Sequence, residues 1–197
     1  MNFLRDTWYI TIRDLRARIR MPVFIFMSLF QPILWLVLFT QIFKSLGGLP
    51  GLGTSTYLQF FAPGVLVMMA LFGSAFSGFG MLWDMDTGIL SKMLATPVTR
   101  ASIIIGRVLA NTIVVILQSL IIIIVALVMG VHMKTGASGV VFSFFLIALL
   151  GLGFSAFSNG LALLLKRQEN VMAVTNLLTM PLMFLSSLMM PAALLPH

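Results

Sequence analysis

Cysteine is absent from this sequence, and charge is scarce: 9% of its 197 residues are charged, and five of them are acidic. Without cysteine the chain cannot form disulfides, present a thiol nucleophile or bind zinc or iron–sulfur groups through thiolates. The two histidines, His132 and His197, belong to no cluster of metal ligands or catalytic groups. The Gly-x-x-x-x-Gly-Lys-Ser/Thr motif of a nucleotide-binding loop is also missing. We therefore predict no metal, no cofactor and no enzymatic activity in the chain itself.

Long hydrophobic runs are what the sequence has instead, since 60% of its residues are hydrophobic. About 20 helical residues cross the roughly 30 Å hydrocarbon layer of a bilayer. Five nearly uncharged runs reach that length, at about 21–43, 60–83, 103–131, 140–165 and 171–190. Backbone groups in lipid must bond internally, so each run is predicted to be an α-helix. The fold class predicted is all-α integral membrane, with a transmembrane domain at 21–197.

The charged residues fall mostly on one side of this topology. If the N-terminus is inside, ten of the twelve basic residues and all five acids face the cytoplasm: Arg5, Arg13, Arg16, Arg18, Arg20, Lys92, Arg100, Arg107, Lys166, Arg167, Asp6, Asp14, Asp84, Asp86 and Glu169. The net charge of +7 is thus better explained by a membrane surface than by nucleic acid. We predict a multi-pass protein of the cytoplasmic (inner) membrane with a cytoplasmic N-terminus.

The end of the sequence lacks the polar tail that usually closes a membrane protein. Five spans from an inside N-terminus leave the C-terminus outside. We therefore expect a six-span design from which the last span is missing.

Residues 1–20 have the pattern of an amphipathic helix. Apolar residues recur at spacings of three and four, with arginines on the other side; the apolar set is Leu4, Trp8, Ile12, Leu15 and Ile19. Arginine favours an anionic leaflet and tryptophan the head-group zone, so this helix is predicted to lie in the inner interface. It is either a simple anchor or a helix that also touches a cytoplasmic partner.

A few polar residues interrupt the spans. Arg107, Asn111 and Gln118 share one face of the third span and could line a translocation path. Amides in spans also serve as interhelical hydrogen bonds, which is the reading we favour. No acid or histidine lies deep in a span, which argues against an ion-coupled carrier. Small residues four apart in spans two and four mark faces of close helix approach, within the chain or across a dimer.

The loop at 84–100 is predicted to contain a short helix. Asp84 or Asp86 can cap it, and Ile89, Leu90, Met93 and Leu94 are expected to share one face, with Pro97 ending it. Such a helix could fit a groove on a cytoplasmic protein, or it could be a plain connector. A second inner loop at 165–171, which carries Lys166, Arg167 and Glu169, could make a similar contact.

Three segments resemble a known family: "FFAPGVLVMMALFGSAFSG" (60–78), "DMDTGILSKMLATPVTRASIIIGRVLAN" (84–111) and "FLSSLMMPAALLP" (184–196). They are similar to the type-2 ATP-binding-cassette (ABC-2) exporter permeases of drug resistance and polysaccharide export. In that family the acid-x-acid-x-Gly run and the following Pro-x-x-Arg contact the ATPase subunit. The resemblance assigns this contact to Asp84, Asp86, Gly88, Pro97 and Arg100, with Met85 where the family usually has a basic residue.

The resemblance implies the permease subunit of an ATP-driven exporter, working as a homodimer with a separate ATPase that binds ATP and magnesium. The expected cargo is a hydrophobic or amphipathic compound, drug-like first and lipid or lipid-linked saccharide second. Two alternatives stay open: an ion-coupled secondary carrier, and a membrane assembly protein that transports nothing.

Overall fold

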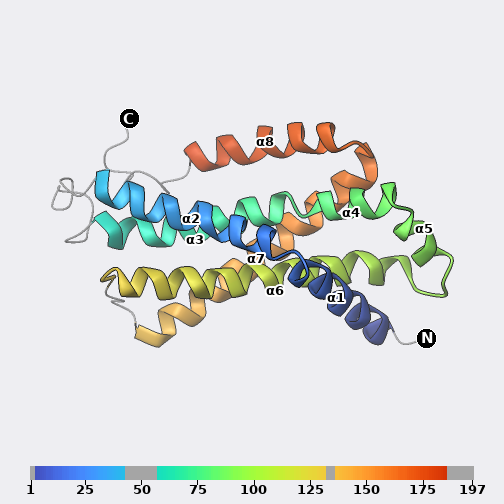
Figure 1. Ribbon diagram of the computed structural model, residues 1–197, viewed down its shortest axis with the longest axis horizontal. Coiled ribbons are helices and arrows are strands. Elements are labelled where there is room, and N and C mark those ends of the chain that lie inside the picture. Colours follow the sequence, from blue (N-terminus) through green and yellow to red (C-terminus); the bar gives the residue numbers. More distant parts are fainter. Residues whose placement is uncertain (1–2, 43–56, 132–135, 186–197) are drawn as a thin grey trace.

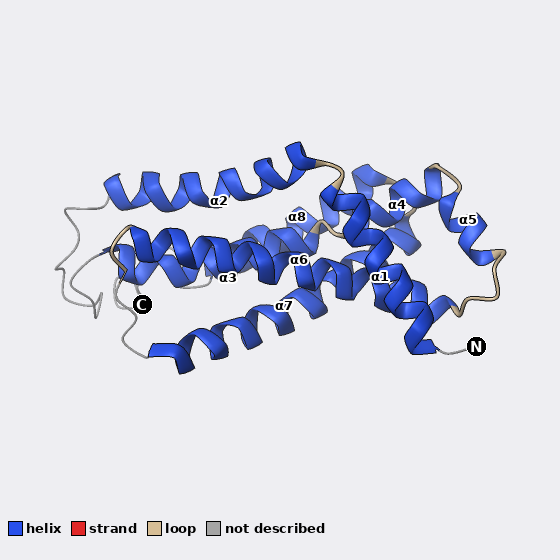
Figure 2. Ribbon diagram, turned by 60° about the horizontal axis from the view of Figure 1, so that its bottom comes forward, coloured by secondary structure: helices blue, strands red, loops and turns tan. Residues whose placement is uncertain are grey.

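The computed structural model describes residues 3–42, 57–131 and 136–185, and helices account for nearly all of them (Figure 1). Figure 2 shows helices and connecting loops, with no strand in those residues. The helices follow in the order α1 (Phe3–Ile19), α2 (Pro22–Ile42), α3 (Tyr57–Ala75), α4 (Gly78–Asp86), α5 (Ile89–Leu94), α6 (Arg100–Val128), α7 (Gly136–Leu165) and α8 (Gln168–Leu185).

Four segments of the described chain are long and apolar enough to cross a membrane: Ile25–Ile42, Phe61–Asp86, Arg100–Val128 and Ser138–Leu165. They coincide with the first four predicted spans, so the all-helical, multi-pass class is confirmed. The predicted count of five is not, because α8 is not among these segments. The end of the fifth predicted span, 186–190, lies outside the described residues.

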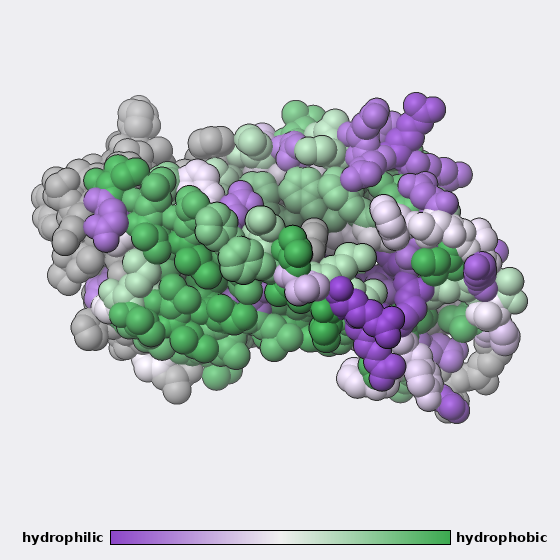
Figure 3. All heavy atoms as spheres, viewed as in Figure 1, coloured by the Kyte–Doolittle hydropathy of each residue, from purple (hydrophilic) through white to green (hydrophobic). Residues whose placement is uncertain are grey.

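The long helices run between two ends of the molecule (Figure 1). One end carries α1, α5 and the turn at 166–167 between α7 and α8, and we call it the charged end. Hydrophilic residues gather there, and hydrophobic residues cover the long middle of the visible face (Figure 3). This separation matches a protein whose middle lies in lipid.

The helices α3 and α6 form the centre of the bundle. In an 18-residue apolar window of each span, 50% of the α6 residues and 61% of the α3–α4 residues are buried, against 6% in α2 and 17% in α7. One buried cluster joins α2, α3, α6 and α7 around Leu36, Phe61, Val115 and Ile147. A second cluster joins the short helices of the charged end to α6, α7 and α8. Its members are Ile10, Met81, Leu82, Leu90, Ile103, Ala162 and Val171.

The second span is broken, which corrects the prediction of one continuous helix at 60–83. Two turn residues, Phe76 and Ser77, separate α3 from α4. At the break, α7 replaces part of the helical hydrogen bonding: Ser158 Oγ accepts from the Gly78 amide (2.9 Å) and donates to the Ala75 carbonyl. A side chain at position 78 would collide with the carbonyl oxygen of Ser158, so glycine is needed for this approach.

The small residues of spans two and four meet at the same place. The hydroxyls of Ser77 and Ser155 lie 2.9 Å apart, and Asn159 Nδ2 donates to Ser77 Oγ (3.3 Å). Sequence left open whether these small-residue faces meet within one chain or across a dimer. The structure brings them together within the chain.

The helix α1 packs on α6 rather than lying apart from the bundle. It buries Thr7, Ile10 and Thr11, and Thr11 Oγ1 donates to the Gly106 carbonyl (3.1 Å). A Cβ at Gly106 would lie 2.8 Å from the Cβ of Ile10 and 2.9 Å from the carbonyl oxygen of Thr7. The absence of a side chain on Gly106 therefore permits the crossing of the two helices.

The apolar residues that predicted an interfacial helix are not the ones that pack on α6. Leu4, Trp8 and Ile19 are exposed. The helix therefore has three faces: one on α6, one exposed and apolar, and one basic. Contact of the apolar face with a membrane interface stays a prediction.

Candidate functional site at the charged end

The predicted short helix exists as α5, but it begins differently from the prediction. Asp84 and Asp86 both lie inside α4, and neither caps α5. The residue before α5 is Gly88 in the left-handed conformation (φ +70°), with no side-chain cap. Glycine takes this conformation at little cost, so a sharp turn joins α4 to α5. The prediction of an aspartate cap was wrong because the aspartates belong to the preceding helix.

The apolar residues of α5 are divided between the interior and the surface. Leu90 is buried in the cluster at the charged end and Met93 packs against it, whereas Ile89 and Leu94 are exposed beside the exposed Lys92. The prediction that all four apolar residues share one face is therefore wrong. A helix of six residues anchored by Leu90 presents two apolar side chains and one cation to its surroundings.

Several other predicted contact residues also lie on this surface. The exposed members are Asp86, Pro97, Arg100, Lys166, Arg167 and Glu169. Lys166 has a positive φ of 54°, unusual for a residue other than glycine, and this marks the sharp turn from α7 into α8. Val171, just after this turn, belongs to the same buried cluster as Leu90. The α5 helix, the 166–167 turn and the start of α8 are therefore parts of one packed unit.

Asp84 differs from the rest of the predicted contact set because it is buried. Its Oδ2 accepts hydrogen bonds from Arg107 of α6 and from Arg13 of α1. Asp84 is 6% exposed and Arg107 is 5% exposed, so this pair lies in the interior. Asp84 thus holds α4 to α1 and α6 and is not available to a partner protein.

A second aspartate completes the ion network. Asp14 Oδ1 accepts from Arg13 (2.8 Å), and Asp14 Oδ2 lies 3.9 Å from Arg107 Nε. Two arginines and two aspartates thus balance one another where α1, α4 and α6 meet. Burial alone would lower the pKa of Arg13, but the hydrogen bond to Asp84 and the charges of both aspartates outweigh it and raise that pKa. Arg13 also contacts the sulfur of Met93 in α5.

The predicted polar stripe of the third span faces other helices of the same chain. Arg107 binds Asp84, Asn111 Nδ2 donates to Ser74 Oγ (3.3 Å) and Gln118 Nε2 donates to Ser28 Oγ (2.7 Å). These three residues are buried and reach α4, α3 and α2 respectively. The arrangement corresponds to the interhelical alternative, and each contact adds cohesion where lipid offers no polar partner.

Sequence reasoning missed the contributions of Arg13 and Asp14 to the network. The sequence pattern places Arg13 on the basic side of an amphipathic helix and Asp14 only among the acids of the cytoplasmic side. The available signal was an aspartate within a run of arginines, next to threonines at positions 7 and 11 that fit neither an apolar nor a charged face. Such small polar residues are typical of close helix packing.

The comparisons with known proteins agree with one another. A family model described as ABC-2 type transporter matches residues 5–197. A protein described as transport permease ycf38, from Cyanophora paradoxa, is 31% identical over 195 residues, covering 98% of this chain and 67% of that protein. Its counterpart from Porphyra purpurea is 28% identical, covering 90% of this chain and 61% of that protein.

A further relative is the daunorubicin resistance ABC transporter permease protein DrrB1 of Streptomyces coeruleorubidus. It is 23% identical over 184 residues, covering 93% of this chain and 64% of that protein. The chain therefore spans about two thirds of the length of these relatives. No solved structure matches it.

Proposed function

The chain belongs to the ABC-2 type transporter family, and we propose that it is the membrane-spanning permease subunit of an ATP-driven exporter. The family makes it a membrane transport component rather than a catalytic subunit. The cargo we propose is a hydrophobic or amphipathic compound, drug-like first and lipid or lipid-linked saccharide second. The name of the relative DrrB1, which refers to daunorubicin resistance, supports that order.

The observation that carries the proposal is the surface formed by α5, the turn at 166–167 and the start of α8. Ile89, Lys92 and Leu94 of α5 are all exposed, and α5 lies at the end of the molecule where the hydrophilic residues gather (Figure 3). Short amphipathic helices bind apolar grooves on partner proteins. We propose that the partner is an ATP-binding-cassette ATPase, which binds the ATP and magnesium that this chain has no loop to hold.

The packing behind α5 suggests how such a partner would act. A displacement of α5 would pass through Leu90 into the cluster that includes Met81 and Leu82 of α4 and Val171 of α8. Packed interfaces move between discrete arrangements rather than deforming continuously. We propose that closure of the ATPase switches α4 and α8 between two such packings, in a homodimer of the permease.

The orientation of the protein in the membrane can be inferred from the basic residues at the same end of the molecule. The ten basic residues in the described part of the chain lie in α1, at Arg20 directly after it, in α5, in the first half of α6 or in the 166–167 turn. Basic residues near the ends of spans remain on the cytoplasmic side. We propose that the charged end and the N-terminus face the cytoplasm of a cell bounded by this membrane.

A cross-linking experiment tests this docking surface, and it is possible because the chain has no native cysteine. Ser91→Cys places a single thiol on the exposed side of α5, and Val128→Cys places one at the opposite end of α6, where Val128 is 84% exposed. Each variant is co-expressed with an ATP-binding-cassette ATPase subunit, and membranes are treated with a short thiol-to-amine cross-linker. A permease–ATPase product with Ser91→Cys and none with Val128→Cys is expected. Equal amounts of cross-linked product from the two variants, or no product from correctly folded Ser91→Cys protein, would contradict the docking surface.

A charge reversal tests the same contact without a cross-linker. Asp86→Lys changes an exposed residue at the start of the turn into α5, so folding should be preserved while the ATPase is released from membranes. The matched control, Asp6→Lys, makes the same charge change on α1. Unchanged ATPase retention with Asp86→Lys would favour the assembly-protein alternative, which tolerates reversal at this surface.

An ion-coupled carrier remains a second candidate because of one observation. Such a carrier needs a buried ionisable pair, and Asp84 and Arg107 form one. Its position near the charged end, rather than midway along a span, fits a structural role better. Uptake of a hydrophobic dye into inside-out vesicles distinguishes the exporter from the carrier. ATP with the ATPase should drive the uptake, and a proton or sodium gradient alone should not. Gradient-driven uptake without ATP would establish the carrier.

A further inference from the structure

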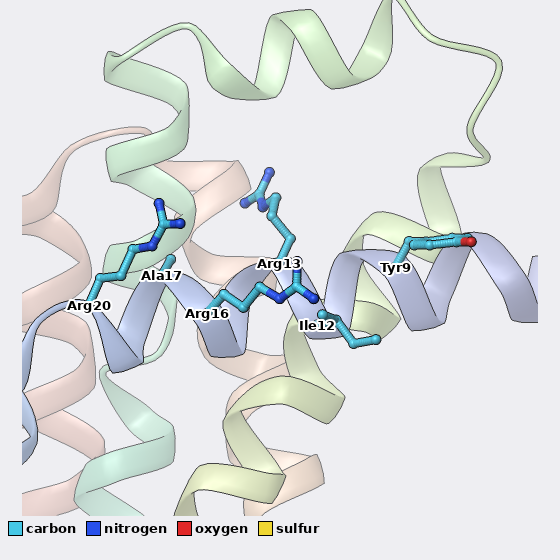
Figure 4. A pocket seen from close by; sticks show the side chains of 6 residues that line it. All are labelled: Tyr9, Ile12, Arg13, Arg16, Ala17 and Arg20. Atoms are coloured by element: carbon cyan, nitrogen blue, oxygen red, sulfur yellow. The ribbon is translucent and has the colours of Figure 1, made fainter.

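A basic pocket opens on α1 at the charged end. Its volume is about 370 Å³, and its lining consists of Tyr9, Ile12, Arg13, Arg16, Ala17 and Arg20 (Figure 4). In Figure 4, Arg13 and Arg20 extend from the same side of α1, and the Arg16 side chain runs along the helix with its guanidinium group toward Ile12. Three guanidinium groups and no carboxylate therefore line this cavity.

The three arginines differ in how their charge is balanced. Arg13 is paired with Asp14 and Asp84. Arg16 and Arg20 take part in none of the ion pairs found among residues 3–42, 57–131 and 136–185. They are four residues apart on one helix face, where like charges repel each other. A bound anion would remove that repulsion.

The position of the pocket along the chain determines how deep it lies in the bilayer. The helix α1 ends at Ile19, and the first membrane-spanning segment begins at Ile25, so Arg20 lies five residues before it. On an adjacent face of α1, the exposed side chains are apolar: Leu4, Trp8 and Ile19. Tryptophan prefers the level of the lipid head groups. The anions present at that depth are lipid phosphates.

We propose that this pocket binds the phosphate of an anionic lipid head group. Guanidinium groups match phosphate oxygens with paired hydrogen bonds, which gives Arg16 and Arg20 the main role. Ile12 and Ala17 provide apolar contacts for the glycerol portion. A zwitterionic choline lipid also has a phosphate, but its ammonium group would meet the same positive field. The pocket therefore selects phosphatidylglycerol over phosphatidylcholine.

The test uses the purified full chain in detergent, without any ATPase, so it is independent of the docking proposal. Native mass spectrometry measures the retention of added phosphatidylglycerol, phosphatidylcholine or inorganic phosphate. Each arginine near an anionic surface contributes roughly a fivefold gain in affinity, so Arg16→Gln/Arg20→Gln should weaken phosphatidylglycerol binding about 25-fold. Arg16→Lys/Arg20→Lys, which keeps the charge but loses the paired geometry, should fall between this variant and the unmodified chain.

The control removes the same charge elsewhere. Lys166→Gln/Arg167→Gln alters two exposed basic residues at the charged end that do not line the pocket, and it should change the affinity less than about twofold. If the double variant of α1 elutes as misfolded protein, Arg16→Gln and Arg20→Gln alone should each show the fivefold loss. Equal losses in the control, unchanged binding in the α1 variants, or inorganic phosphate bound as tightly as the lipid would each overturn the proposal.

Discussion

The ion network of α1, α4 and α6 predicts a specific pattern of stability losses. Asp84→Asn keeps the shape of the side chain and removes its charge. Arg107, which is 5% exposed, then retains Asp14 at 3.9 Å as its remaining carboxylate, while Arg13 competes for the same group. The cluster changes from two balanced pairs to two cations with one anion. The protein should be strongly destabilised.

The size of each stability loss depends on how deeply the remaining charges are buried. Removing one partner of a buried ion pair costs about 3–5 kcal/mol, because the other charge stays desolvated without compensation. Arg107→Met should fall in the same range, since it leaves two aspartates with Arg13. Arg13→Gln should cost only about 1 kcal/mol, because the Arg13 side chain is 37% exposed and the Asp84 that it leaves keeps Arg107 as a partner. Asp84→Asn and Arg107→Met should thus lower the free energy of unfolding much more than Arg13→Gln does.

The double variant Asp84→Asn/Arg107→Met distinguishes an ion network from simple loss of packing. Arg13 and Asp14 then balance each other, so the double variant should be more stable than either single variant of the buried pair. Free energies of unfolding come from denaturant titration in mixed micelles, followed by circular dichroism. A coupling energy of at least about 2 kcal/mol is expected. Additive losses, or a loss below about 1 kcal/mol for Asp84→Asn, would refute the reasoning.

Two further predictions concern helix packing. Gly106→Ala should destabilise the protein by roughly 1–3 kcal/mol and increase proteolysis of α1, since its Cβ would lie 2.8 Å from that of Ile10. In the control Gly73→Ala the new Cβ would lie an ordinary 3.5 Å from Val115 Cγ2, so thermal unfolding should show a neutral or stabilising effect. In the cysteine-free chain, Ser77→Cys/Ser155→Cys should form a disulfide under mild oxidation, and the product should run as a monomer in non-reducing gels. A covalent dimer would show that these faces meet between chains.

The positions of the long helices could be predicted because hydrophobicity alone determines them. The first and third spans, predicted at 21–43 and 103–131, appear as Pro22–Ile42 and Arg100–Val128. The break within the second span could not be predicted in the same way. It depends on Ser158, about 80 residues later in the chain, which bonds the backbone at Gly78.

The short helix of the predicted site could be predicted in part, for a similar reason. The existence of a short helix after Asp86 follows from local sequence, because Gly88 permits a turn and Pro97 disfavours a longer helix. The orientation of its side chains follows from the surroundings. Leu90 is buried because α4, α7 and α8 supply apolar neighbours, and Asp84 is buried because Arg107 and Arg13 compensate its charge.

The helix α1 has a third face, packed on α6, that the sequence pattern of one apolar and one basic face does not predict. Apolar periodicity separates hydrophobic from charged residues, but Thr7 and Thr11 belong to neither group, and they meet α6 together with Ile10. Their small size allows the backbones to approach at Gly106, and that approach brings Arg13 within reach of Asp84 in α4 and Met93 in α5. A displacement of α5 must therefore alter the contacts of Arg13. The helix α1 is consequently part of one route by which a force on α5 reaches the spans.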